Sequence, residues 1–160
     1  MKESDVVELV TLFKIRYPHA KWHEDDALTY RVWHMALEDL PTPAVMQVVP
    51  DLMRESVFPP DPADIRSRIF AHSGLLPEAD QAWGMVVDQV KGRRDPATTP
   101  MTVKLCIKDI GGIFMLRQSE HPERDRDRFI KAYSARRREA MVDPQVVGML
   151  DAAQLDQGAA

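Results

Sequence analysis

The sequence predicts an all-α protein. Apolar residues recur at spacings of three and four along most of the chain, the pattern that buries one side of an α-helix. Prolines and glycines interrupt this pattern at short intervals, and helix-capping residues accompany several of these interruptions. No segment sustains an alternation of apolar and polar residues rich in β-branched side chains, so no sheet is expected.

Two helices are expected in the first 40 residues. The first covers about residues 4–17 and ends at Pro18, because proline cannot continue a helix. Its apolar stripe consists of Val6, Leu9, Val10, Phe13 and Tyr17. The second covers about residues 24–40, carries acidic residues in its first turn, where the helix dipole favours them, and ends at Pro41.

The third helix begins at Thr42-Pro43, an N-cap followed by proline at the first helical position. Val45, Val48, Val49 and Leu52 form its apolar side. Pro50 lies within this pattern, removes a backbone hydrogen bond and costs about 3 kcal/mol in a helix interior. We therefore expect a kink or an early end at Pro50.

The fourth helix follows the segment Phe58-Pro59-Pro60. Asp61 is expected to be its N-cap, with Pro62 at the first helical position and Asp64 three residues after the cap. The prolines and the cap give the segment from Phe58 to Arg66 a structural role. A rigid exposed corner that contacts a partner is the alternative.

Further helices are expected after residue 76. One starts near Pro77 and continues to about Val90, and Thr99-Pro100 opens another that Gly111-Gly112 ends. A short helix over residues 113–118 and a long one over about residues 122–141 follow. Asp143-Pro144 should start one or two more turns before a polar tail from Gln154 that we expect to be disordered.

The chain of 160 residues is long enough for one domain or a domain with an appendage. We expect a compact N-terminal four-helix module over residues 1–75 and a C-terminal helical, partner-binding segment over residues 76–142. A short helix and a flexible acidic tail should occupy residues 143–160. Residues 1–80 carry 8 basic and 14 acidic side chains and residues 81–142 carry 13 and 8, so the two halves should have different partners.

The sequence lacks the motifs of the common enzyme and cofactor sites. It has no Gly-x-x-x-x-Gly-Lys-Ser/Thr phosphate loop, no His-Glu-x-x-His and no Gly-x-Ser-x-Gly. We therefore expect a protein that is not an enzyme, with no catalytic residue, no cofactor and no metal. The acids near His23 are attributed to the start of a helix rather than to a metal site. Cys106 is expected to be buried and inert.

The chain also lacks an apolar run of the roughly 18 residues that a membrane span requires, and its polar start is unlike a signal peptide. We expect a cytoplasmic protein that does not contact membranes.

The long helix near the C-terminus has two different faces. At about 100° per residue, Phe129, Tyr133 and Ala140 share one side. The opposite side carries Arg124, Arg128, Lys131 and Arg138. This helix is predicted to bind the partner through these residues: Arg124, Arg128, Phe129, Lys131, Tyr133, Arg136, Arg137 and Arg138. In the alternative interpretation, Phe129 and Tyr133 pack on the two helices between residues 77 and 110, and the cations form a solvated surface.

The order of these signals resembles one family, the small replicative helicase loader/inhibitor proteins of phages that infect Gram-positive bacteria. The matching elements run over about residues 3–141. They are Tyr17-Pro18, Leu40-Pro41, Phe58-Pro59-Pro60 with Asp64-Ile65, Ala82-Trp83, Gly111-Gly112 and Phe129-Ile130-Lys131-Ala132-Tyr133.

The resemblance implies a non-catalytic, ATP-independent adaptor that binds a DnaB-type hexameric replicative helicase, delivers it to the origin complex and holds it inactive. It also implies an origin-binding replication protein as a second partner and a phage-infected or lysogenic bacterial cell as the location. Two alternatives remain open. One is a nucleic-acid-binding packaging or regulatory protein that uses the basic C-terminal helix. The other is a helical structural or regulatory protein of another kind.

Overall fold

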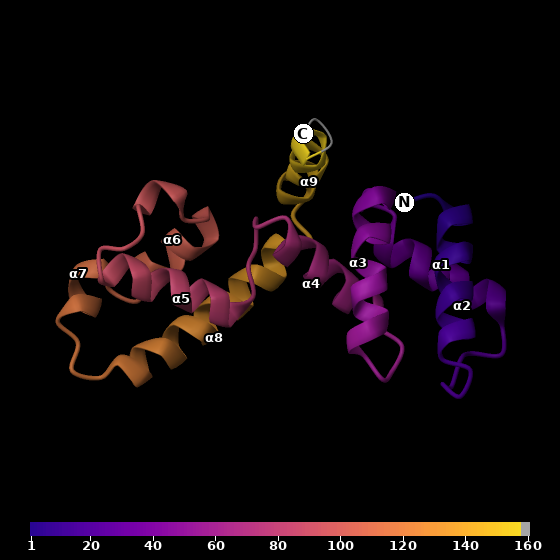
Figure 1. The fold of residues 1–160 in the computed structure, drawn as a ribbon, viewed down its shortest axis with the longest axis horizontal. Helices are drawn as coiled ribbons and strands as arrows, with labels where there is room; N and C mark the ends of the chain where they lie inside the picture. Colours follow the sequence, from indigo (N-terminus) through magenta and orange to yellow (C-terminus); the bar gives the residue numbers. More distant parts are fainter. Residues whose placement is uncertain (158–160) are drawn as a thin grey trace. The chain divides into compact units, whose positions relative to one another are not determined.

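The structure, a computed structural model, describes the backbone of residues 1–157 and the side chains of residues 1–150. It consists of α-helices joined by short loops, and the described residues contain no strand, which confirms the all-α prediction (Figure 1). The helices are α1 Glu3–Arg16, α2 Asp26–Leu37, α3 Thr42–Glu55, α4 Pro62–His72, α5 Ala79–Val90, α6 Met101–Asp109, α7 Gly112–Arg117, α8 Pro122–Ala140 and α9 Pro144–Gln157. A single 3-10 turn, Pro96–Thr98, precedes α6.

The chain forms two compact units. Unit 1 comprises Met1–Ser73 together with α9, and unit 2 comprises Gly74–Asp143. The sequence-based boundaries after residues 75 and 142 concern independent domains, and they stay a prediction.

The core of unit 1 is built from the apolar sides of its first four helices, with α1 against α2 and α3 against α4. The Phe13 and Trp33 rings lie 5.6 Å apart and join α1 to α2. The predicted cap of α4 is present: the Asp64 N–H donates to the Asp61 carboxylate at 2.9 Å, and the Asp61 N–H donates to the Asp64 carboxylate at 3.0 Å. Such a reciprocal pair fixes the first turn of a helix.

The predicted early end of α3 is wrong. The helix passes through Pro50 and ends at Glu55. Pro50 itself is exposed, whereas Val48, Val49 and Leu52 on either side of it are buried. Burial of an aliphatic side chain contributes about 1.5–3 kcal/mol, so these contacts outweigh one missing backbone hydrogen bond.

The core of unit 2 lies where α8 packs against α5 and α6. Gly111 adopts φ 110° between α6 and α7, a conformation that favours glycine, so the expected glycine stop is present. The buried residues of this core are Ala82, Val86, Val103, Cys106, Ile107, Ile110, Phe129 and Tyr133.

The C-terminal end differs from the expectation. We expected one or two helical turns and a disordered tail from Gln154, but α9 continues to Gln157. The sequence after Gly148 contains leucine and alanine residues with high intrinsic helix propensity, which favours the longer helix. The last part of the expected tail, residues 158–160, lies outside the described residues.

Candidate partner-binding surfaces

The apolar face of α8 is buried inside unit 2. Phe129 and Tyr133 have no exposed surface. Their rings stack with centroids 5.5 Å apart, and the Trp83 ring of α5 lies 5.5 Å from Phe129. This is the alternative in which the apolar face packs on the preceding helices. Neither ring is presented to a partner in this structure.

Two polar side chains anchor α8 to the segment before α5. The Tyr133 hydroxyl donates to the Pro77 carbonyl at 2.8 Å. Arg137, which is 7% exposed, donates to the Leu76 carbonyl at 3.2 Å and to the Glu78 carboxylate at 2.7 Å. Burial raises the pKa of Tyr133 well above its usual value, so the hydroxyl stays a donor. Arg137 therefore acts as a structural residue rather than a surface contact.

Arg136 is also engaged within unit 2. It donates to the Asp109 carboxylate of α6 at 2.6 Å, and this hydrogen bond raises the pKa of the Arg136 guanidinium. Cys106 lies in the core next to this pair, and burial raises the pKa of its thiol. The thiol is therefore kept protonated and buried, as expected from the sequence.

The outward face of α8 carries a cationic stripe, which we define as Arg124, Arg128, Lys131 and Arg138. All of them are exposed. Arg128 is 3.9 Å from the Asp125 carboxylate, and Arg138 donates to the Ser134 carbonyl of its own helix at 3.3 Å. Within the described part of the chain, neither Arg124 nor Lys131 has an acidic side chain within ion-pair distance. At about 1.5 Å per residue, the stripe is roughly 21 Å long.

The predicted partner-binding residues thus fall into two groups. The stripe is accessible, whereas Phe129, Tyr133 and Arg137 are buried and Arg136 is paired with Asp109. A role of α8 in partner contact stays a prediction, and it now concerns the stripe alone. The helical wheel separated the two faces, but it could not identify the tertiary partners of Arg136 and Arg137.

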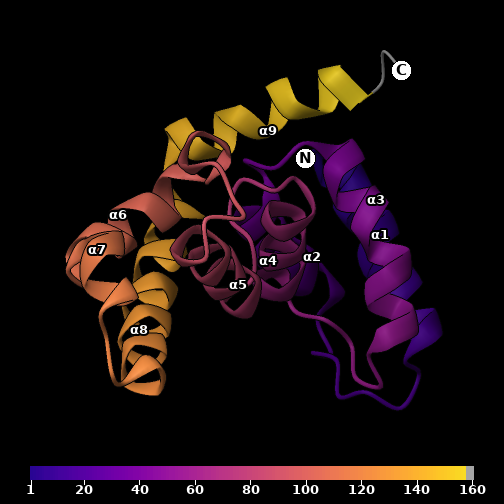
Figure 2. The same cartoon turned by 60° about the vertical axis from the view of Figure 1, so that its left-hand side comes forward.

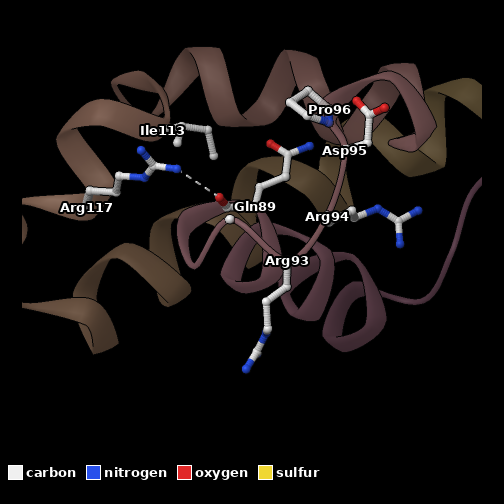
Figure 3. A pocket seen from close by; sticks show the side chains of 8 residues that line it. Gln89, Arg93, Arg94, Asp95, Pro96, Ile113 and Arg117 are labelled. Carbon is white, nitrogen blue, oxygen red and sulfur yellow. Dashed lines mark hydrogen bonds between the residues drawn. The ribbon is translucent and has the colours of Figure 1, made fainter.

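Unit 2 also contains an open pocket of about 550 Å³ beside the loop after α5. Arg93, Arg94 and Arg117 line it, a composition that could suggest an anion site. Figure 3 shows that these side chains do not converge: Arg117 points toward the Gln89 carbonyl, while Arg93 and Arg94 point in other directions. Arg93 pairs with Asp88 at 2.6 Å, and Arg94 donates to the Thr98 carbonyl at 2.9 Å. The arginines hold the loop, and the pocket lacks a focused anion cradle.

The acidic and histidine-containing segment at the start of α2 serves the helix. The Asp25 carboxylate accepts the Leu28 N–H at 3.1 Å as the N-cap, and Asp26 forms an ion pair with Lys14. The His23 Nδ1 accepts the Asp25 N–H at 3.0 Å. Among the described residues, no three His, Cys, Asp or Glu side chains are grouped so that they could hold a metal ion.

An exposed apolar corner lies between α3 and α4 in unit 1. Val57 and Phe58 are 83% and 78% exposed. The loop that carries them and the loop after α1 lie at the same end of the unit in both views (Figures 1 and 2). The sequence indicated this corner by its prolines.

Comparison with known families decides what unit 1 is. Residues 1–66 match the family model for the N-terminal domain of the phage SPP1 helicase loader. The N-terminal region of this chain belongs to that family of phage helicase loaders. The loader-domain match covers α1 to α3 and the start of α4, and it confirms the family expected from the sequence. Neither a curated protein nor a solved structure matches the chain.

The loader-domain match does not extend to α5–α9, so the cationic stripe lies outside it. No helix in residues 1–157 combines the length and the apolar character that crossing a membrane requires.

Proposed function

We propose that this protein is a non-catalytic adaptor that binds a DnaB-type hexameric replicative helicase, delivers it to the origin complex and holds it inactive. The single observation that carries this proposal is the loader-domain match over residues 1–66. The sequence has no phosphate-binding loop, in line with ATP-independent action. The protein would work in the cytoplasm of a phage-infected or lysogenic bacterial cell, with an origin-binding protein as its second partner.

The proposed helicase contact is the cationic stripe of α8. Its cations are exposed, and the buried Phe129 and Tyr133 rings keep the helix fixed beneath them. A rigid positive surface favours an acidic surface on the helicase and accelerates their encounter. Because the adaptor supplies no chemical energy, it can hold the ring inactive only by binding one ring conformation more tightly than another.

The test uses the full-length chain and the purified cognate helicase. Arg124→Glu/Lys131→Glu should weaken binding by about tenfold or more and reduce the effect on helicase ATPase, because it reverses the charge of the stripe. The matched control is Arg31→Glu/Lys91→Glu, which makes the same charge change at exposed positions outside the stripe and should retain wild-type affinity.

Co-elution and ATPase measurements separate the possible failures. A wild-type chain that does not co-elute with the helicase at micromolar concentration contradicts the proposed function. Equal affinities for the wild type and the stripe variant contradict only the choice of surface. Truncation after Glu120 is a poor test, because it removes the part of the unit 2 core that α8 supplies.

The stripe also supports a second candidate function, nucleic-acid binding, since its cations extend over roughly 21 Å of one helix face. Fluorescence anisotropy with a labelled single-stranded oligonucleotide distinguishes this candidate. Phosphate contacts predict an affinity whose logarithm falls steeply with the logarithm of the salt concentration. The outward face of α8 has no aromatic residue on which bases could stack, so the helicase proposal is favoured.

A further inference from the structure

Unit 1 displays an apolar tip formed by Val57 and Phe58. Each side chain keeps more than three quarters of its surface in solvent, at 83% and 78%. An exposed phenylalanine at the tip of a loop has no role in the core of its own unit. What distinguishes this tip from a mobile loop is the number of bonds that hold its backbone.

Ser56 organises the loop from within. Its N–H donates to the Leu52 carbonyl at 3.0 Å and ends α3. Its hydroxyl donates to the Phe58 carbonyl at 2.6 Å and accepts the Phe58 N–H at 3.2 Å. The Tyr17 hydroxyl donates to the Ser56 carbonyl at 3.2 Å and ties the loop to the end of α1. The loop is therefore fixed on its α3 side.

The α4 side is fixed by prolines and by the helix cap. Pro60 is buried, and the reciprocal hydrogen bonds between Asp61 and Asp64 begin α4 directly after it. Proline restricts its own φ, and the residue before a proline is restricted as well. The backbone around Phe58 has little freedom left to lose on binding.

The base of the tip is cationic. The Arg16 guanidinium lies 5.0 Å from the Tyr17 ring centroid, and its Nη2 donates to the Met53 carbonyl at 3.4 Å. Within residues 1–150, no carboxylate forms an ion pair with Arg16. The nearby acids are occupied elsewhere, since Glu55 pairs with Arg68 and Asp61 caps α4. The charge of Arg16 therefore stays available beside the apolar tip.

We propose that the Val57–Phe58 tip inserts into an apolar pocket with an acidic rim on a second protein partner, one other than the helicase. Aromatic side chains that fill a pocket at the centre of an interface dominate binding energies. A tip that is already ordered also loses less conformational freedom on binding than a flexible loop. This inference rests on the proposed adaptor function and assigns its second partner to unit 1.

The experiment uses the full-length chain and the purified cognate origin-binding protein as the probe, with affinities from calorimetry. Phe58→Ala should weaken this binding by about 30-fold or more and leave helicase affinity unchanged. Met35→Ala is the matched control, since Met35 is 68% exposed on α2 of the same unit, and should retain both affinities. Ser56→Ala keeps the phenylalanine but loosens the loop, and should cause a smaller loss of several-fold.

The outcomes separate this inference from the function on which it rests. A wild-type chain that binds the helicase but not the origin-binding protein, or whose Phe58→Ala variant binds both as well as wild type, overturns the assignment of the tip. A chain that does not bind the helicase overturns the proposed function instead. Loss of helicase affinity in Phe58→Ala, or a Phe58-dependent dimer in sedimentation, would also overturn the inference, since the tip would then contact the ring or a second copy.

Discussion

Among single residues, Asp5 shows how one side chain fixes two helices of unit 1. Its carboxylate accepts the Thr42 hydroxyl at 2.8 Å, so the start of α3 is held to the start of α1. It also accepts the Lys2 N–H at 3.3 Å. These hydrogen bonds, that of Thr42 first, lower the pKa of Asp5 because they favour the charged carboxylate.

Replacing the donor should reverse this effect. Thr42→Val should raise the pKa of Asp5 toward its ordinary value, measured by an NMR titration of the carboxyl carbon. The control is Thr11→Val, since the Thr11 hydroxyl donates within α1 to the Val7 carbonyl. An unchanged pKa in Thr42→Val would mean that the Thr42 hydroxyl does not set the charge state of Asp5.

The same bond makes the stability of unit 1 depend on pH. A depressed carboxyl pKa stabilises the folded state above the unfolded-state value of about 3.9. This contribution is lost as the pH falls through the lower folded-state pKa. The Thr42→Val variant should therefore lose less stability than wild type when the pH falls below about 4.

Residues of the candidate site mark the limit of what the sequence could predict. The helical wheel of α8 separates Tyr133 from Lys131, because that separation depends only on helix geometry. It cannot show that Arg137 reaches the Leu76 carbonyl and Glu78, which lie about 60 residues earlier in the chain. Tertiary contacts of this kind depend on how α8 packs against α5, and no local pattern encodes them.

Among the helices, local signals predicted most positions well. The Asp61-Pro62 cap and the start of α8 at Pro122 appear where the sequence placed them, since caps and prolines act within one turn. Thr42 and Thr99 are different. α3 and α6 begin at Thr42 and Met101, and Thr99 is buried, where its hydroxyl accepts from Gln89. A distant polar partner has replaced the expected capping role of each threonine.

Pro50 is the clearest case in which packing overrides a local signal. Pro50→Ala restores an N–H within α3 and should raise the unfolding free energy of unit 1, by up to about 3 kcal/mol. Urea denaturation measures the change. Pro43→Ala is the control, since Pro43 lies in the first turn of the same helix, where proline is tolerated, and its effect should stay below about 1 kcal/mol. A Pro50→Ala variant no more stable than wild type would show that α3 has already absorbed the proline.

Across the chain as a whole, the two units have separate cores. Unit 1 buries residues such as Leu9, Phe13 and Phe70, and unit 2 has its own cluster around Val86 and Phe129. The loader-domain match ends within α4 and therefore falls entirely in unit 1. The proposed adaptor places one candidate surface on each unit, the Val57–Phe58 tip on unit 1 and the cationic stripe on unit 2.

This arrangement predicts that each unit can lose stability without the other. Leu9→Ala should lower the opening free energy of unit 1 by about 2–5 kcal/mol, and Ile107→Ala should do the same for unit 2, because each leaves a cavity in one core. Hydrogen exchange read by mass spectrometry follows both units in one sample. The unsubstituted unit should change by less than about 0.5 kcal/mol, as expected for sites without shared contacts. Equal loss of protection in both units would mean that they open cooperatively, and binding at the tip would then be coupled energetically to binding at the stripe.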